Sequence, residues 1–261
     1  MKNIRFFTPA FAFTLILFTF SCKDGGDPVI PTDCTDVHWT YDGTEGPDHW
    51  TELCTGYSEC GGPAQSPVDI HNTSVDASLS AISRSYAGSQ TNILNNGHTL
   101  QFTYDAGSSI TVNGEQYDLL QFHFHTSSEH TVNGASHPME VHLVHKNAAS
   151  GKLAVIGIFF EEGAENTLLN KFISHLPADH DGTYTSTDVY SAADLLPAGQ
   201  GYYTYQGSLT TPPCSEIVTW IVMKDHIEAS SAQIHDIEAL EHENNRPVQA
   251  IGSRIIKEFG G

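Results

Sequence analysis

Two stretches of the chain, LLQFHFHTSSEH at 119–130 and MEVHLVHKN at 139–147, determine the fold that the sequence predicts. In both, apolar and polar side chains alternate, as they do along a β-strand with one buried face. The pair Asn133-Gly134 between them is a turn signal. We therefore expect neighbouring strands over residues 116–126 and 139–145 that can pair in antiparallel fashion.

Strand patterns continue on both sides of this pair. Residues 99–104 alternate between apolar and polar, while 152–160 and 216–223 are apolar runs typical of strands buried on both faces. Short strands separated by turns favour an antiparallel sheet over βαβ units. The predicted fold is mainly β with peripheral helices, in a single domain around a large twisted, mostly antiparallel sheet.

Few helices are expected, and both have recognisable start signals. Asn166 can cap a helix that carries apolar residues at helical spacing and stops at Pro177. Ser230 and Gln233 have the spacing of a capping box, which predicts a second helix after them.

The composition is that of an acidic globular protein. Of 261 residues, 39% are hydrophobic and 16% are charged, so the chain can bury a core and does not match disordered segments. Lys plus Arg number 11 against 31 for Asp plus Glu, which gives a formal net charge of −20. No basic cluster interrupts this balance, so we expect no nucleic-acid partner.

The N-terminus carries an export signature. Lys2 and Arg5 precede an almost wholly apolar run that ends before Cys22. This pattern predicts a signal peptide over residues 1–21. A cysteine directly after such a run resembles a bacterial lipidation site, so we predict a lipid anchor at Cys22, with plain secretion or a retained anchor as alternatives. Residues 22–33 read as a flexible tether, and 34–261 as one domain. The expected location is the periplasm, the outer membrane or the cell surface.

Four cysteines remain after Cys22: Cys34, Cys54, Cys60 and Cys214. An even set behind an export signal favours disulfides, because disulfides persist outside the cytosol. Four cysteines allow three pairings, and spacing alone does not choose among them. Zinc ligation by these cysteines is not favoured, since the chain has no C-x-x-C spacing.

The histidines of the two strands form a candidate metal site. On a strand, His123 and His125 project to the same face as Gln121, and on the next strand His142 shares a face with Glu140. Antiparallel pairing would bring the three imidazoles together. Three histidines with a fourth position left to water are a catalytic zinc set, so the predicted cofactor is Zn2+.

Polar neighbours at the same strand parity can orient these rings. Gln121 can accept the second ring N–H of His123, and Glu140 that of His142. For His125 the sequence offers no side-chain acceptor, so we expect a backbone carbonyl there. We interpret His130 and His145 as structural, and expect His38, His49 and His137 to be exposed to solvent.

Five further blocks accompany the histidine strands: HWTYDGTEGPDHW at 38–50, AQSPVDI at 64–70, NNGHTLQFTY at 95–104, GSLTTPPCSEIVTW at 207–220 and NNRPVQAIGSRIIK at 244–257. With QFHFHTSSEHTVNG and MEVHLVHKN, they closely resemble the α-class carbonic anhydrases, in that family's order, over about residues 38 to 257. Such ordered agreement is far more specific than a single H-x-H motif.

The resemblance assigns roles by position. His123, His125 and His142 correspond to the zinc ligands, and Thr210 to a gatekeeper hydroxyl that accepts from zinc-bound hydroxide and donates to Glu129. His98 occupies the proton-shuttle position. The implied activity is reversible hydration of carbon dioxide to bicarbonate and a proton, through attack of the zinc-bound hydroxide.

The remaining implied residues line the substrate pocket or form disulfides. Gln101 departs from the family's commonest residue at its place in the polar wall. The residues are the apolar wall Val144, Val155, Leu209, Val218 and Trp220; substrate-binding Thr211; the polar wall Tyr41, Asn96 and Gln101; and the disulfide pairs Cys60–Cys214 and Cys34–Cys54. Sulfonamides and anions are the implied inhibitors, and a homodimer is left open.

Two other functions are compatible with parts of the sequence. His123, His125 and Glu129 have the H-x-H-x-x-x-E spacing of a cupin-type metal protein. That reading leaves the other blocks unexplained. A non-enzymatic surface binding module is the second alternative, because a fold can persist after its activity is lost. Metal identity separates the first alternative from an enzyme of the resembled family, and an assay of hydration separates the second.

Overall fold

The computed structural model describes residue 30 and residues 32–261. The predicted signal peptide, Cys22 and most of the predicted tether lie outside these residues. Within the described part of the chain, no helix combines the length and the apolar character that a membrane crossing requires.

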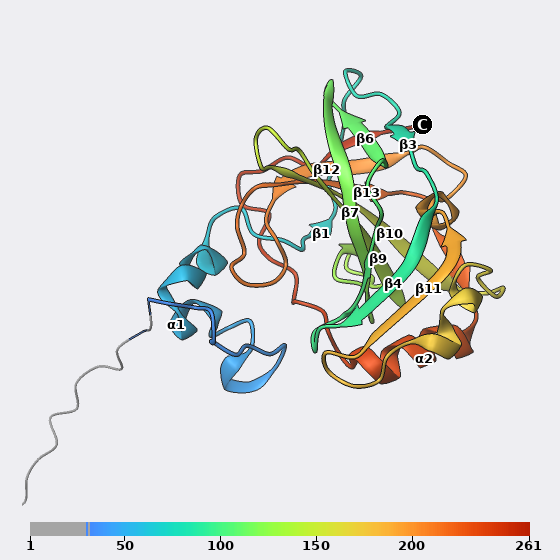
Figure 1. Cartoon of the computed structure of the whole chain (residues 1–261). Helices are drawn as coiled ribbons and strands as arrows, with labels where there is room; N and C mark the ends of the chain where they lie inside the picture. The colour runs from blue at the N-terminus through green and yellow to red at the C-terminus, as the bar shows by residue number, and fades with distance from the viewer. Residues whose placement is uncertain (1–29, 31) are drawn as a thin grey trace, which may run out of the picture.

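Four long strands form the centre of the fold: β7 (Glu115–His125), β9 (Met139–Lys146), β10 (Leu153–Glu162) and β13 (Val218–Met223). β7 pairs with β9 and β9 with β10 in antiparallel fashion, whereas β10 and β13 run parallel. Figure 1 shows these strands crossing the middle of the molecule. The strand pair expected from the two decisive stretches is therefore confirmed.

The main sheet also contains β2 (Ser74–Val75), β3 (Ser83–Ser85), β4 (Ser89–Asn95), β5 (Leu100–Thr103), β6 (Ser109–Val112), β11 (Thr183–Tyr190), β12 (Tyr202–Gly207), β14 (Ile227–Ala229) and β15 (Lys257–Phe259). Its strands follow the order β11-β4-β5-β7-β9-β10-β13-β12-β15-β2. It is mixed but mostly antiparallel, as predicted, since only the pairs β10–β13, β10–β14 and β15–β2 are parallel within it. β1 (Asp69–Ile70) and β8 (Thr131–Val132) form a separate parallel pair.

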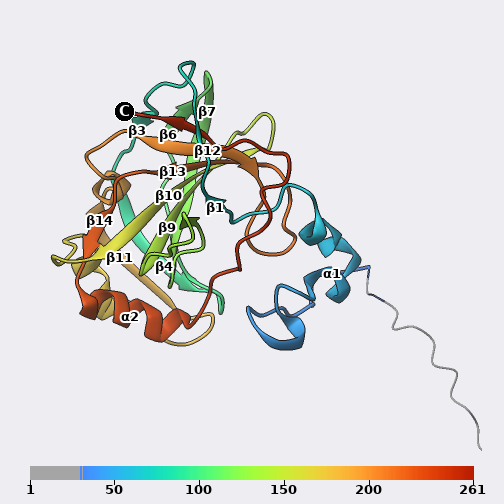
Figure 2. The same cartoon turned by 180° about the vertical axis from the view of Figure 1, so that it is seen from behind.

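Helices are short and peripheral. Helix α2 (Ser231–Glu241) begins with the capping box expected from Ser230 and Gln233, and it lies at the lower end of the sheet in Figures 1 and 2. Helix α1 (Trp50–Leu53) belongs to an N-terminal segment at one side of the sheet. The short 3₁₀ turns are η1 (Gly43–Glu45), η2 (Thr55–Gly61), η3 (Leu169–Lys171), η4 (Ile173–His175) and η5 (Ala192–Leu195).

The helix predicted after Asn166 is wrong in type. The Asn166 side chain does accept from the backbone N–H of Leu168 and Leu169, so the start signal works locally. The segment then forms the two turns η3 and η4. Tertiary packing overrides the helical spacing here, because the apolar side chains of Leu168, Leu169 and Phe172 are buried against the sheet.

Two apolar layers cover the faces of the sheet. Phe122 and Phe124 point into the larger layer, as their strand parity predicts, and are fully buried there. The smaller layer includes Val155, Val218 and Trp220. Along β7 and β9, the three predicted ligand histidines alternate with the apolar residues that point into the larger layer. These histidines therefore face away from the larger layer, and the polar site lies next to the smaller one.

Candidate metal centre and catalytic pocket

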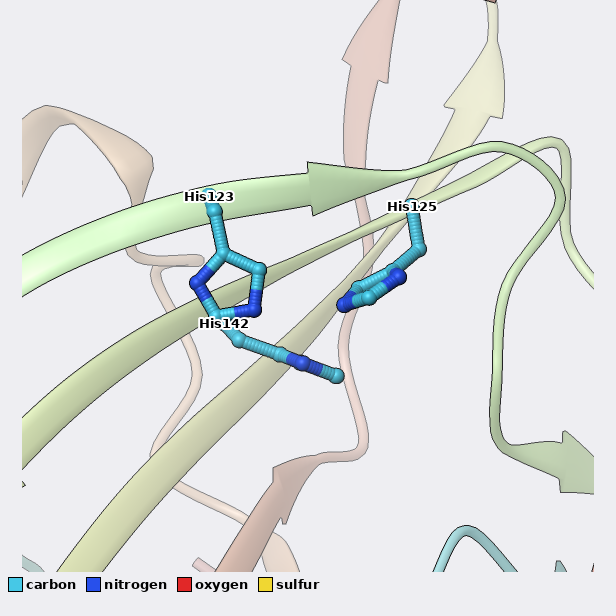
Figure 3. Close-up of side chains that lie close together, drawn as sticks. All are labelled: His123, His125 and His142. Carbon is cyan, nitrogen blue, oxygen red and sulfur yellow. The ribbon is translucent and has the colours of Figure 1, made fainter. Parts of the chain in front are cut away.

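The pairing of β7 with β9 brings the three predicted ligands together. His123 lies directly opposite His142 in the register, and His125 lies opposite Glu140. One nitrogen of each imidazole lies within 4.8 Å of the others. Figure 3 shows the three rings converging from two adjacent strands. The antiparallel register is thus what converts two motifs separated in sequence into one cluster.

Each ring is oriented by a different hydrogen-bond acceptor. Nδ1 of His123 lies 2.9 Å from Oε1 of Gln121, and Nε2 of His142 lies 2.9 Å from Oε1 of Glu140. Nδ1 of His125 donates to the backbone carbonyl of Asn244 at 2.7 Å. The positions expected for Gln121 and Glu140 match this geometry, and a backbone carbonyl serves His125.

These contacts leave one nitrogen lone pair of each ring available. Nε2 of His125 is buried and has no hydrogen-bond partner among the described residues. An unpartnered buried nitrogen costs free energy, which a bound metal would offset. Burial lowers the pKa of His125, and lowers that of His123 well below 6.5 with the neighbouring His125 and His142 as further causes. For His142, burial lowers the pKa, but the carboxylates of Glu140 and Glu129 outweigh burial and raise the pKa above 6.5. The neutral imidazole is the form that binds metals, so metal binding would displace the proton of that ring, and the three imidazole nitrogens fit Zn2+.

Glu140 holds two histidines at once. Its Oε1 lies 2.8 Å from Nδ1 of His130, while its Oε2 accepts the backbone N–H groups of Glu129 and His130. Burial alone would raise the pKa of Glu140, but His130 and His142 hold it well below 4.5. The carboxylate therefore stays charged, and the turn after β7 is tied to β9.

The histidines interpreted as structural are confirmed as buried, hydrogen-bonded groups. Nε2 of His130 lies 2.7 Å from the hydroxyl of Tyr205. His145 contacts the hydroxyl of Tyr86 at 2.9 Å and the carbonyl of Ala154 at 3.2 Å. Burial lowers the pKa of His145 to about 4, so this ring is neutral at pH 7.

Glu129 lies beside the ligand cluster. Its Oε1 accepts the backbone N–H of Arg246 at 2.9 Å, while Oε2 lies 3.6 Å from Nε2 of His125 and has no hydrogen-bond partner in the described part of the chain. Thr210 is buried in the loop after β12. The hydrogen bond expected from Thr210 to Glu129 stays a prediction, with Oε2 as its available acceptor.

A small cavity opens from the ligands towards the N-terminal segment. It measures about 140 Å³, and its lining combines His123 and His125 with His98, Thr211 and the expected polar-wall residues Tyr41, Asn96 and Gln101. The residues expected in the apolar wall gather in the smaller apolar layer: Val144, Val155, Leu209, Val218 and Trp220. The polar group lines the inner cavity, whereas the apolar group does not line it. The apolar group reaches the ligands through Trp220, whose ring lies against that of His142 with centroids 4.8 Å apart.

His98 lies between this cavity and a larger outer one. Its ring stacks on Trp39 with centroids 3.7 Å apart, and it lines both the inner cavity and an outer cavity of about 590 Å³. The ring is half-buried. Burial, followed by the nearby His38 and His180, lowers the pKa of His98 below its usual 6.5.

One expectation about the remaining histidines is wrong. His38 and His49 are exposed as expected, but the side chain of His137 is only 11% exposed. Its ring stacks on Phe159, and its Nδ1 lies 2.8 Å from Glu161. The strand pattern begins two residues later, so it gave no sign that this ring is covered by a neighbouring strand.

Both implied disulfides are present in the structure. Cys60 is bonded to Cys214, which follows the loop with Thr210 and Thr211, and Cys34 is bonded to Cys54. The first joins the N-terminal segment to this loop. Arg246 reinforces the junction, because it donates to the carbonyls of Cys60 and Ser66.

Comparison with known proteins agrees with this arrangement. The model of the eukaryotic-type carbonic anhydrase family matches residues 45–259. A carbonic anhydrase of Klebsiella pneumoniae is 42% identical over 88% of this chain and 94% of its own length. One from Neisseria gonorrhoeae is 40% identical over 85% of this chain and 88% of its own length.

Solved structures are similar over the same region. An α-carbonic anhydrase from Thermovibrio ammonificans, solved with the inhibitor sulfanilamide, is 40% identical with a TM-score of 0.82, covering 85% of this chain and 99% of that one. A hyperthermostable carbonic anhydrase from a hydrothermal vent chimney is 46% identical with a TM-score of 0.81, over 85% and 100%. On the family match, the relatives and the shared fold, the chain belongs to the eukaryotic-type, or α-type, carbonic anhydrases.

Proposed function

We propose that this chain catalyses the reversible hydration of carbon dioxide with zinc held by His123, His125 and His142. The observation that carries the proposal is the cluster of three imidazoles, each with one nitrogen held by a separate acceptor and the other left available. In carbonic anhydrases generally, zinc in such a site lowers the pKa of water to about 7 and so supplies hydroxide at neutral pH.

The protein residues position the reactants. The apolar layer around Val155, Val218 and Trp220 offers carbon dioxide a surface without competing hydrogen bonds. We assign Thr210 the orientation of the attacking oxygen: its hydroxyl would accept a hydrogen bond from that oxygen and donate one to Oε2 of Glu129, which has no hydrogen-bond partner among the described residues. Such orientation restricts the nucleophile to productive geometries, which is a gain from proximity and alignment.

His98 would carry the product proton away from the site. It lines both the inner and the outer cavity, so a proton received on one side can leave on the other. Its pKa lies below 6.5, so the ring is mostly neutral and can accept a proton at pH 7. As pH falls through this pKa, the charged ring loses that capacity, and the shuttle contribution declines.

His98→Ala is therefore expected to lower turnover in weak buffer by roughly a hundredfold, the lower end of what a positioned proton-transfer group contributes. Added imidazole should restore the rate, because it replaces the missing proton acceptor. Stopped-flow hydration assays at several buffer concentrations measure both effects. His235→Ala is the matched control and should leave the rate unchanged, since His235 is an exposed histidine that lines neither cavity. Equal rates with and without imidazole in the His98 variant would remove the assignment.

The activity itself has a direct test. Purified protein should hydrate carbon dioxide, lose activity with a zinc chelator, and regain it with added Zn2+. Sulfanilamide should inhibit it, as it does the Thermovibrio ammonificans enzyme with which it was solved as an inhibitor complex; simple anions are expected to inhibit as well. Zinc-loaded protein without hydration above the buffer rate would favour a binding module instead.

We also propose that the chain is exported and anchored through a lipid on Cys22, in the periplasm or at the outer membrane or cell surface. The charged and apolar residues before Cys22 support this location. The two disulfides support it further, because disulfides persist in oxidising compartments. Mass analysis of the N-terminus would detect the lipid, and light scattering of the soluble domain would test the homodimer that the sequence leaves open.

A further inference from the structure

A second group of metal-binding side chains lies outside the catalytic pocket. His137 precedes β9, Glu161 is near the end of β10, and His226 precedes β14. β10 pairs with both of the other strands, and Phe160 lies opposite Met139 on one side and Ile227 on the other. Three chain segments therefore place these side chains at one end of the sheet.

The donor atoms of this group are close together. Nδ1 of His137 lies 2.8 Å from Oε1 of Glu161, and Nδ1 of His226 lies 3.4 Å from the same oxygen. One candidate ligand atom from each of the three residues lies within 4.8 Å of the others. The two rings have centroids 4.6 Å apart, so both nitrogens approach the carboxylate from neighbouring positions.

These separations suit a small divalent metal. Ligand bonds of about 2.0 to 2.1 Å in a tetrahedral site place the donor atoms about 3.3 Å apart. The chain carries a formal net charge of −20, and Asp225 adds a carboxylate next to His226 in the sequence. A cation is therefore favoured electrostatically over an anion in this region.

The site is anchored on one side and open on the other. The ring of His137 is stacked on Phe159 with centroids 4.1 Å apart, and its backbone is held by two hydrogen bonds with Ser128, so this ligand has little freedom to lose on binding. Side chains of His226 and Glu161 are 36% and 46% exposed, which provides an entry path and room for a water ligand.

We propose that His137, Glu161 and His226 form a second, exchangeable binding site for a divalent transition metal of the zinc, copper and nickel class. Two imidazoles with one carboxylate favour these ions over Mg2+ or Ca2+, which prefer oxygen ligands alone. The site is separate from the three catalytic histidines and shares no ligand with them. Its role is to cross-link the segments before β9 and before β14 to β10 when metal is present.

The test counts metal ions per chain. Protein loaded with one zinc at the catalytic site is equilibrated with Zn2+ by dialysis, and bound metal is measured by mass spectrometry. The wild type should bind two ions, while His226→Asn and Glu161→Gln should each bind one. Both variants should keep wild-type hydration activity and the first zinc, which separates this site from the proposed catalytic one. Added Zn2+ should raise the melting temperature of the loaded wild type but not of either variant.

His235→Asn is the matched control. His235 is an exposed histidine that lies 3.6 Å from the carboxylate of Glu238. Among the described residues, this pair has no third metal-binding side chain within reach. This variant should bind two ions like the wild type. A loaded wild type that takes up no second ion, or a second ion that persists in both His226→Asn and Glu161→Gln, would overturn the proposal and leave a hydrogen-bonded cluster only.

Discussion

Replacement of His123 by alanine should reduce carbon dioxide hydration by more than a hundredfold and strip zinc from the protein. Loss of an orienting neighbour alone typically costs ten- to a hundredfold in affinity or activity at metal sites, and loss of a ligand should cost more. His123 lines the inner cavity, so truncation enlarges an existing space rather than opening a void in the core. Zinc content by mass spectrometry and stopped-flow hydration measure the two losses together.

Two variants make this result specific to ligation. Gln121→Ala removes the acceptor 2.9 Å from Nδ1 of His123 but keeps all three ligands, so it should cause a smaller loss of zinc affinity and rate. His71→Ala, at an exposed histidine outside the cluster, should leave both unchanged. Full zinc content and full activity in the His123 variant would show that the catalytic metal is held elsewhere.

Removal of the disulfide between Cys60 and Cys214 should be the most destabilising change outside the metal site. The bond joins residues 154 apart in the sequence, and the loop-closure relation gives about 5 kcal/mol for a cross-link of this span. A double replacement by serine should therefore unfold at much lower denaturant concentration than the wild type. Equilibrium unfolding in urea, followed by tryptophan fluorescence, measures the difference.

The second disulfide provides the comparison. Cys34 and Cys54 are 20 apart, for which the same relation gives about 3 kcal/mol, so their removal should cost less. The Cys60–Cys214 variant should also lose activity before it unfolds globally, because Cys214 follows the loop with Thr210 and Thr211. If the two double variants have the same stability, loop length does not govern the effect here.

The elements of the fold that could be predicted are those whose signal lies within a single segment of the sequence. β7 and β9 follow from their alternation, β10 and β13 from continuous apolar runs, and α2 from its capping box. The parallel pairing of β10 with β13 was not predictable, because strand patterns do not encode direction. The helix after Asn166 was mispredicted because helical spacing does not distinguish an α-helix from successive 3₁₀ turns in so short a segment.

The candidate site was predictable where its members share a strand. Gln121 and Glu140 each lie two residues from the histidine they orient, so parity alone identifies them. Asn244 was not identifiable as the partner of His125, since it acts through its backbone carbonyl and stands 119 residues away. Trp39, which stacks on His98, was missed for a related reason: long-range packing of one ring on another leaves no periodic signal.

The distance in sequence between His125 and Asn244 bears on the order in which the site can form during synthesis. The hairpin that carries all three histidines is complete long before the segment after α2 leaves the ribosome. Until that segment arrives, the His125 ring lacks its fixed acceptor and Glu129 lacks the N–H of Arg246. The complete set of hydrogen bonds around the three histidines therefore needs a segment that is synthesised almost last. If the chain is exported as proposed, we expect it to acquire its metal in the compartment where folding ends.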